Sequence, residues 1–162
     1  MENVRIVPAR VEDVPVILRL IKALAEYERM SDQVVATEDD LRAGLFGDRP
    51  IAEAVLARAG DTVVGFALFI HNFSTFLGRP GLYLEDLFVV PDWRGRGVGR
   101  QLLAYVAGVA VERGCGRMEW SVLDWNEPAV GFYQRLGARV MEEWRICRLT
   151  GEALARVASG DA

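Results

Sequence analysis

The stretch Asp92–Leu103 places three glycines and three arginines between an apolar run and a segment with helical spacing. Glycines at the start of a helix expose backbone N–H groups that bind anions, and the helix dipole adds to that attraction. A dinucleotide fingerprint would need its third glycine where Arg100 stands, and no Gly-Lys-Ser/Thr closes the loop as in an NTPase. The loop therefore predicts a phosphate site of another kind. The alternative is a glycine turn whose arginines are only solvated.

Two adjacent carboxylates, Glu85 and Asp86, interrupt the apolar run that precedes this loop. A strand with apolar residues on both sides buries most of its side chains, and successive side chains point to opposite faces. Because a buried, unpaired carboxylate is costly, we expect at least one of the two to have a chemical role. The alternative is that one carboxylate pairs with an arginine, which suits Asp86 better than Glu85.

The elements that must position these residues follow from the hydrophobic periodicity, which predicts the order β-α-α-β-β-β-α-β-α-β. This order indicates an α+β (mixed α/β) domain without internal repeats. Thr37 and Asn126 are the expected helix N-caps, and a looser loop is expected around Gly78 and Pro80. The expected strands are residues 4–7, 51–59, 62–71, 82–90, 118–122, 139–141 and 144–149, and the expected helices are residues 11–29, 38–46, 98–113, 127–136 and 152–158.

Length and composition restrict the function further. The chain has 162 residues, 51% of them hydrophobic and 26% charged, which predicts one globular domain over residues 1–162. A net charge of −4 argues weakly against a nucleic-acid partner and is compatible with a cationic substrate, although ordinary solubility by itself explains the charge better. Cys115, Cys147 and His71 have no metal-site or disulfide spacing. With no export signal and no long uncharged apolar run, we expect a cytoplasmic protein without a membrane segment.

The glycine loop resembles the pyrophosphate loop of the GNAT family of acetyl-CoA-dependent N-acetyltransferases, whose pattern is Arg/Gln-x-x-Gly-x-Gly/Ala. Arg94, Gly97 and Gly99 match that pattern, and residues 3–150 follow the family's order of elements. More narrowly, the chain resembles the diamine acetyltransferases, which include spermidine/spermine and thialysine acetyltransferases. The motifs that carry this resemblance are Leu84-Glu85-Asp86-x-Phe88-Val89, Trp125-Asn126-Glu127-Pro128, Phe132-Tyr133 and Ile21-Lys22-x-Leu24-Ala25-x-Tyr27-Glu28.

The resemblance implies a mostly antiparallel, twisted central sheet, splayed at the cofactor site and flanked by helices. It also implies acetyl-CoA as co-substrate, with the pantetheine arm on the main chain of the last central strand and the pyrophosphate on the glycine loop. Arg96 and Arg100 could add charge at the phosphate or simply be exposed. The implied cofactor-binding residues are Leu87, Phe88, Val89, Arg94, Gly95, Arg96, Gly97, Val98, Gly99, Arg100, Asn126, Pro128, Ala129 and Tyr133.

The same resemblance implies that Tyr133 protonates the departing thiolate and that Glu85 takes the proton of the amine, directly or through water. The implied substrate-binding residues are Tyr27, Glu28, Glu85, Asp86, Glu142 and Trp144. Ser74 departs from the polyamine enzymes, which carry an acid there, so we expect a small cationic primary amine of the polyamine, diamine or thialysine kind. The alternatives are acetylation of a peptide or an aminoglycoside, or a non-catalytic acyl-CoA-binding domain. A homodimer is also implied.

Overall fold

The computed structural model describes residues 3–160, which form two units with their boundary between Ser121 and Val122. The first unit contains the sheet and the first helices, and the second contains two short helices. In the first unit the elements are β1 (Val4–Pro8), η1 (Val11–Asp13), α1 (Val14–Tyr27), η2 (Ser31–Gln33), α2 (Glu38–Phe46), β2 (Glu53–Ala59), β3 (Thr62–Ser74), β4 (Arg79–Val89), η3 (Pro91–Trp93), α3 (Val98–Glu112) and β5 (Met118–Glu119). In the second unit they are α4 (Glu127–Arg135) and α5 (Gly151–Ser159).

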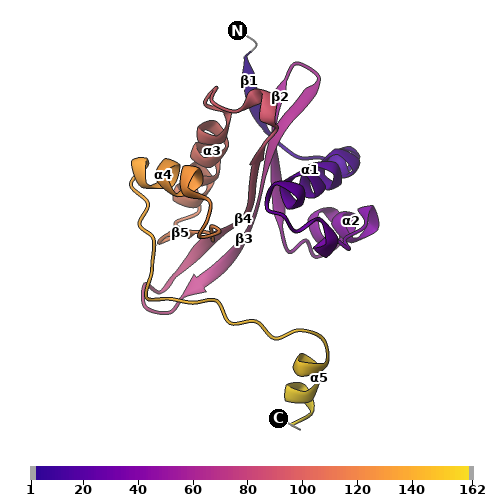
Figure 1. Ribbon diagram of the computed structural model, residues 1–162, viewed down its shortest axis with the longest axis vertical. Coiled ribbons are helices and arrows are strands. Elements are labelled where there is room, and N and C mark those ends of the chain that lie inside the picture. The colour runs from indigo at the N-terminus through magenta and orange to yellow at the C-terminus, as the bar shows by residue number, and fades with distance from the viewer. Residues whose placement is uncertain (1–2, 161–162) are drawn as a thin grey trace. The chain divides into compact units, whose positions relative to one another are not determined.

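The five strands of the first unit form one sheet in the order β1-β2-β3-β4-β5 (Figure 1). Neighbouring strands are antiparallel except β4 and β5, which are parallel, so the predicted α+β class with a mostly antiparallel sheet is confirmed. β5 pairs with β4 only at Leu82 and Tyr83. From Leu84 onward, the second edge of β4 therefore has no strand partner among the described residues.

Helices cover both faces of this sheet: α1 and α2 lie against one face and α3 against the other (Figure 1). A glycine in β3 lets α3 approach closely, because a Cβ on Gly65 would lie 2.7 Å from the carbonyl oxygen of Phe88 and 3.2 Å from a methyl of Leu102. The core on the α1 and α2 face includes the buried residues Ile17, Leu20, Leu45, Leu56, Phe66, Leu68 and Phe88. The buried residues of α3 are Val98, Leu102, Leu103, Val106 and Ala110.

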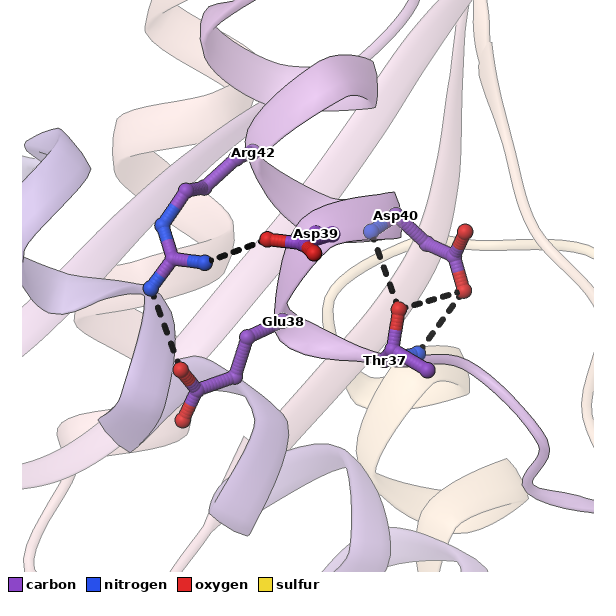
Figure 2. A network of polar contacts seen from close by, with 5 residues as sticks. All are labelled: Thr37, Glu38, Asp39, Asp40 and Arg42. Atoms are coloured by element: carbon purple, nitrogen blue, oxygen red, sulfur yellow. Dashed lines mark hydrogen bonds and ion pairs between the residues drawn. The ribbon is translucent and has the colours of Figure 1, made fainter.

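The start of α2 shows how local sequence fixes a helix boundary (Figure 2). The Thr37 hydroxyl accepts a hydrogen bond from the Asp40 N–H, and the Thr37 N–H donates to the Asp40 carboxylate at 2.8 Å, which together make a capping box. Both Thr37 groups lower the pKa of Asp40, the backbone N–H more than the hydroxyl. Arg42 pairs with Glu38 and Asp39 one turn away. The predicted N-cap at Thr37 is confirmed.

The second unit departs from the sequence prediction. Residues 139–141 and 144–149 were predicted as strands, and the structure has no strand there. Their side chains are mostly exposed, including Trp144 and Ile146, and no other strand pairs with them among residues 122–160. An alternating apolar pattern becomes a strand only when a partner strand satisfies its backbone hydrogen bonds. The prediction, which rested on the pattern alone, was therefore wrong. The final helix, α5, is present as predicted.

Two boundaries in the first unit also differ from the prediction. The strand expected over residues 118–122 is reduced to Met118–Glu119, because the β4 ladder offers partners to those two residues only. Pro80 lies within β4 instead of in a loose loop, where it stands opposite Phe73 in a tight hairpin. Within residues 3–160, no helix has the length and the apolar composition needed to cross a bilayer.

Candidate active site

The glycine loop connects the end of β4 to the start of α3. Gly95 and Gly97 have φ angles of +72° and +80°, a conformation that glycine adopts without strain. Gly97 is the N-cap of α3 and makes no side-chain cap bond, so no side chain of its own occupies the first-turn N–H groups of the helix. A Cβ built on either glycine meets no atom within 4 Å. The loop thus leaves open space at a helix N-terminus, where the N–H groups of the first turn can bind an anion such as a pyrophosphate.

Two arginines of the loop, Arg94 and Arg96, contact aromatic rings. The Arg94 Nε donates a 2.9 Å hydrogen bond to the carbonyl oxygen of Val89. Its guanidinium carbon lies 4.7 Å from the centre of the Tyr27 ring and 5.3 Å from that of Phe88. Arg96 stacks over the ring of Trp93 at 4.9 Å. No sequence pattern indicates the contact between Arg94 and Tyr27, whereas the contact of Trp93 with Arg96 could have been found from their spacing.

A β-bulge determines where the two β4 carboxylates lie. Leu68 pairs with Asp86 and the next residue, Phe69, pairs with Leu84, so Glu85 is an extra residue without a cross-strand partner. Directly paired residues share a face, which places Asp86 with Leu68 on the face covered by α1 and α2. Strict alternation holds on each side of the bulge and is broken only across Glu85.

Asp86 is the carboxylate that the fold perturbs most. Burial, together with the negative charges of Glu85 and Glu28, raises the pKa of Asp86 to about 7. Burial also raises the pKa of Glu28, which caps the C-terminus of α1. Glu85 itself is exposed. Among the ion pairs of residues 3–160, none includes Asp86, so the arginine partner considered from the sequence is not found there.

The first unit therefore brings together an acidic cluster, Glu28, Glu85 and Asp86, beside Tyr27 at the end of α1. Tyr27 keeps 39% of its surface exposed, so its ring is accessible to a ligand. A cationic group is stabilised by such a combination of carboxylates and an aromatic face. A small ligand with at least one ammonium group fits this cluster best.

The second unit carries the remaining predicted residues. The Asn126 side chain accepts a hydrogen bond from the Ala129 N–H at 3.4 Å, which confirms it as the N-cap of α4, and Pro128 lies in the first turn. Tyr133 is half-buried in α4, and its ring lies 5.4 Å from that of Phe132. The other two predicted residues of this unit, Glu142 and Trp144, are exposed and lie outside any helix or strand.

Two polar residues weighed in the sequence have structural partners. Ser74 is buried, and its hydroxyl accepts a hydrogen bond from the Leu77 N–H, which closes the β3–β4 hairpin. A ring nitrogen of His71 lies 3.4 Å from Arg113, whose guanidinium is also bound by both carboxylate oxygens of Glu53. Among the described residues, no group of three metal-ligating side chains is found.

The loop geometry yields a prediction about anion binding. Gly97→Ala is expected to weaken coenzyme A binding about tenfold, because an alanine at this positive φ costs about 1–2 kcal/mol and shifts the N–H groups of the cradle. Titration calorimetry with coenzyme A measures the effect. Gly108→Ala is the matched control: Gly108 lies within α3 with open space at its Cβ, so this change should leave the affinity unaltered. Equal affinities for both variants would show that the loop does not bind the anion.

Known proteins share both the sequence and the fold. Residues 18–138 match the model of the Acetyltransferase (GNAT) family. A thialysine N-epsilon-acetyltransferase of Sus scrofa is 41% identical over 98% of this chain and 99% of its own length. An L-ornithine N5-acetyltransferase of Arabidopsis thaliana is 35% identical over 90% of this chain and 83% of its own length. A solved structure, an integron cassette protein from the mobile metagenome of V. cholerae, is 28% identical with a TM-score of 0.81 and 98% coverage of both chains.

These matches extend over nearly the whole chain and include the glycine loop, the carboxylate strand and α4. They confirm the resemblance found in the sequence, the diamine-type branch included, and they make the protein an acetyl-CoA-dependent N-acetyltransferase. The chain belongs to the acetyltransferase (GNAT) family.

Proposed function

We propose that this protein transfers an acetyl group from acetyl-CoA directly to the primary amine of a small cationic substrate, a polyamine, a diamine or a thialysine- or lysine-like amino acid. The observation that carries the proposal is the cluster of Glu28, Glu85 and Asp86 beside the accessible ring of Tyr27. The two relatives are named for thialysine and L-ornithine, amino acids that carry a second amino group. Both would present a cation to such a cluster.

The donor side of the proposal uses main-chain groups and the glycine loop. Bound acetyl-CoA would supply the acetyl thioester. Among the described residues, no strand pairs with the second edge of β4 beyond Tyr83, which supports binding of an extended ligand along Leu87, Phe88 and Val89 in the manner of an added strand. The open space at Gly95 and Gly97, at the N-terminus of α3, supports the assignment of the pyrophosphate to residues 95–100. From the second unit we propose Asn126, Pro128, Ala129 and Tyr133 as further donor-binding residues.

The acceptor side needs a neutral amine, because only the unprotonated nitrogen can attack the carbonyl. We propose Glu85 as the group that takes the amine's proton, directly or through water. Asp86, with its raised pKa, holds a proton close to neutral pH and lies next in the chain. Tyr133 would donate a proton to the departing thiolate. The proposed acceptor-binding residues are Tyr27, Glu28, Glu85, Asp86, Glu142 and Trp144.

We further propose that residues 1–162 act as one domain in a cytoplasmic homodimer. The cytoplasmic assignment is supported by Cys115 and Cys147, which are both free. The dimer is supported by apolar side chains of the second unit that stay exposed, and an exposed apolar surface is typical of an interface. The most exposed of them are Trp144 and Ile146, at 74% and 73%.

The experiment is thiol release from acetyl-CoA with matched acceptors. 1,4-Diaminobutane is compared with butylamine, and thialysine with its analogue lacking the α-amino group, alongside aminoglycosides and peptides. The acidic cluster predicts that the second positive charge improves kcat/KM at least about tenfold, the gain of one good ion pair. A higher kcat/KM for a peptide or an aminoglycoside than for the small amines would contradict the proposed class of acceptor. Binding of coenzyme A without turnover of any amine would refute the proposed transfer to an amine acceptor.

A further inference from the structure

Arg94 links three parts of the first unit. Its main-chain N–H donates to the carbonyl oxygen of Pro91 at 3.1 Å, which fixes the backbone at the end of η3. Its side chain turns back over the end of β4, where Nε donates to the Val89 carbonyl oxygen. The guanidinium then lies against the rings of Tyr27, from α1, and Phe88, from β4. The glycine loop, the end of α1 and β4 are therefore joined by one side chain.

The two rings differ in what else holds them. Phe88 is 5% exposed and belongs to the core, so its position is fixed by packing. Tyr27 is the last residue of α1 and is 39% exposed, and the guanidinium of Arg94 lies over its ring. A guanidinium within about 6 Å of a ring face is attracted by the ring, and a cation beside a helix C-terminus gains further stabilisation.

The positive charge of Arg94 does not neutralise the neighbouring carboxylate, that of Glu28. Among the ion pairs of the described residues, none joins Arg94 to Glu28, although Glu28 follows Tyr27 directly. The negative charge of Glu28 therefore stays available for a cationic acceptor. Arg94 therefore orients Tyr27, the aromatic residue of the proposed acceptor site, without neutralising the neighbouring carboxylate of Glu28.

We propose that Arg94 is a positioning residue of the acceptor site, which holds the Tyr27 ring against Phe88 and so ties the donor loop to the amine-binding end of α1. This inference rests on the proposed function, since Tyr27 matters here as an acceptor-binding residue. It assigns Arg94 a role on the amine side, where the sequence pattern alone predicts a cofactor contact. The residue lies on the donor loop, but its guanidinium faces the acceptor.

The test compares Arg94→Gln, Arg94→Lys, Tyr27→Leu and the double variant Arg94→Gln/Tyr27→Leu. Arg94→Gln should raise the KM for the best amine about three- to thirtyfold, the range expected for loss of a cation–π contact, and should change the coenzyme A Kd less than about threefold. Arg94→Lys should restore part of the loss, because it keeps a cation over the rings. Tyr27→Leu in the Arg94→Gln background should have a smaller effect than in wild type, since the shared contact is already gone.

The matched control is Arg42→Gln, which removes another exposed arginine from an ion-paired position on α2. It should leave amine KM and coenzyme A Kd at wild-type values. The opposite pattern for Arg94→Gln, a coenzyme A Kd raised tenfold or more with an unchanged amine KM, would identify Arg94 as a phosphate ligand and overturn the proposal.

A second readout does not depend on catalysis. Urea unfolding of wild type, Arg94→Gln, Tyr27→Leu and the double variant without ligand should show that the effects of the two single substitutions are not additive, and additive effects would overturn the contact on which the proposal rests. Failure of the proposed function is distinguishable: wild type would then turn over no amine and bind none by calorimetry, while the unfolding cycle still showed coupling.

Discussion

Tyr133→Phe is expected to lower kcat by about 10²–10⁴, the contribution of a positioned general acid, with little change in coenzyme A affinity. The substitution removes one hydroxyl and keeps the ring, which packs against Phe132 at a tilt of 53° in α4. Binding should survive because we assign it to backbone groups of the loop and of β4. Steady-state kinetics with the best amine and calorimetry with coenzyme A measure the two quantities.

The control for this prediction is Tyr105→Phe, which removes a hydroxyl from a half-buried tyrosine of α3 outside the proposed site. It should retain the wild-type kcat. A fall in coenzyme A affinity or in thermal stability for Tyr133→Phe, at unchanged kcat, would mean that Tyr133 is structural. A thiol of lower pKa as the leaving group should depend less on Tyr133, because a better leaving group needs less protonation.

Asp86→Asn is expected to stabilise the protein more at high pH than at low pH. The folded protein raises the pKa of Asp86 from 3.8 to about 7, so between these values the folded state keeps a proton that the unfolded chain has lost. The unfolding free energy of wild type should therefore fall as pH rises through this window and level off above about pH 7. Asparagine does not titrate, so the unfolding free energy of Asp86→Asn lacks this dependence on pH. The advantage of Asp86→Asn should be greater at pH 8.5 than at pH 5.5 by about 2 kcal/mol.

Urea unfolding of both proteins at the two pH values measures this difference. The groups that raise the Asp86 pKa, after burial, are Glu85 and Glu28, so the comparison variant is Glu85→Gln. Because Glu85 is exposed, that change should alter the unfolding free energy by no more than about 0.5 kcal/mol. A stability difference between wild type and Asp86→Asn that does not vary with pH would contradict the raised pKa.

The same variants separate two roles in catalysis. Glu85→Gln removes the proposed proton acceptor and should lower kcat/KM at every pH. Asp86→Asn should remove a step near pH 7 from the pH profile of kcat/KM, because the group that titrates there is gone. If the step persists in Asp86→Asn and disappears in Glu85→Gln, the roles proposed for the two carboxylates must be exchanged.

Features that depend on a few adjacent residues were determined by the sequence. The Thr37 and Asn126 caps, the glycine loop before α3 and the α+β class all followed from local patterns, because caps and turns are fixed by nearby backbone and side-chain groups. The family also followed, since its motifs are short segments with fixed spacing. The type and order of most elements thus needed no tertiary information.

Other features depended on partners distant in the chain. The bulge at Glu85 arises from the register between β3 and β4, and it alone turns Asp86 to the face of α1 and α2. The contact of Arg94 with Tyr27 joins residues far apart in sequence. The predicted strands at 139–141 and 144–149 did not form for the same reason, since a strand needs a partner that its own sequence cannot specify. The sequence by itself determined the family, the loop and the candidate residues. Only the tertiary structure decided that Asp86 is more buried than Glu85 and that Arg94 contacts Tyr27, because register and packing are long-range.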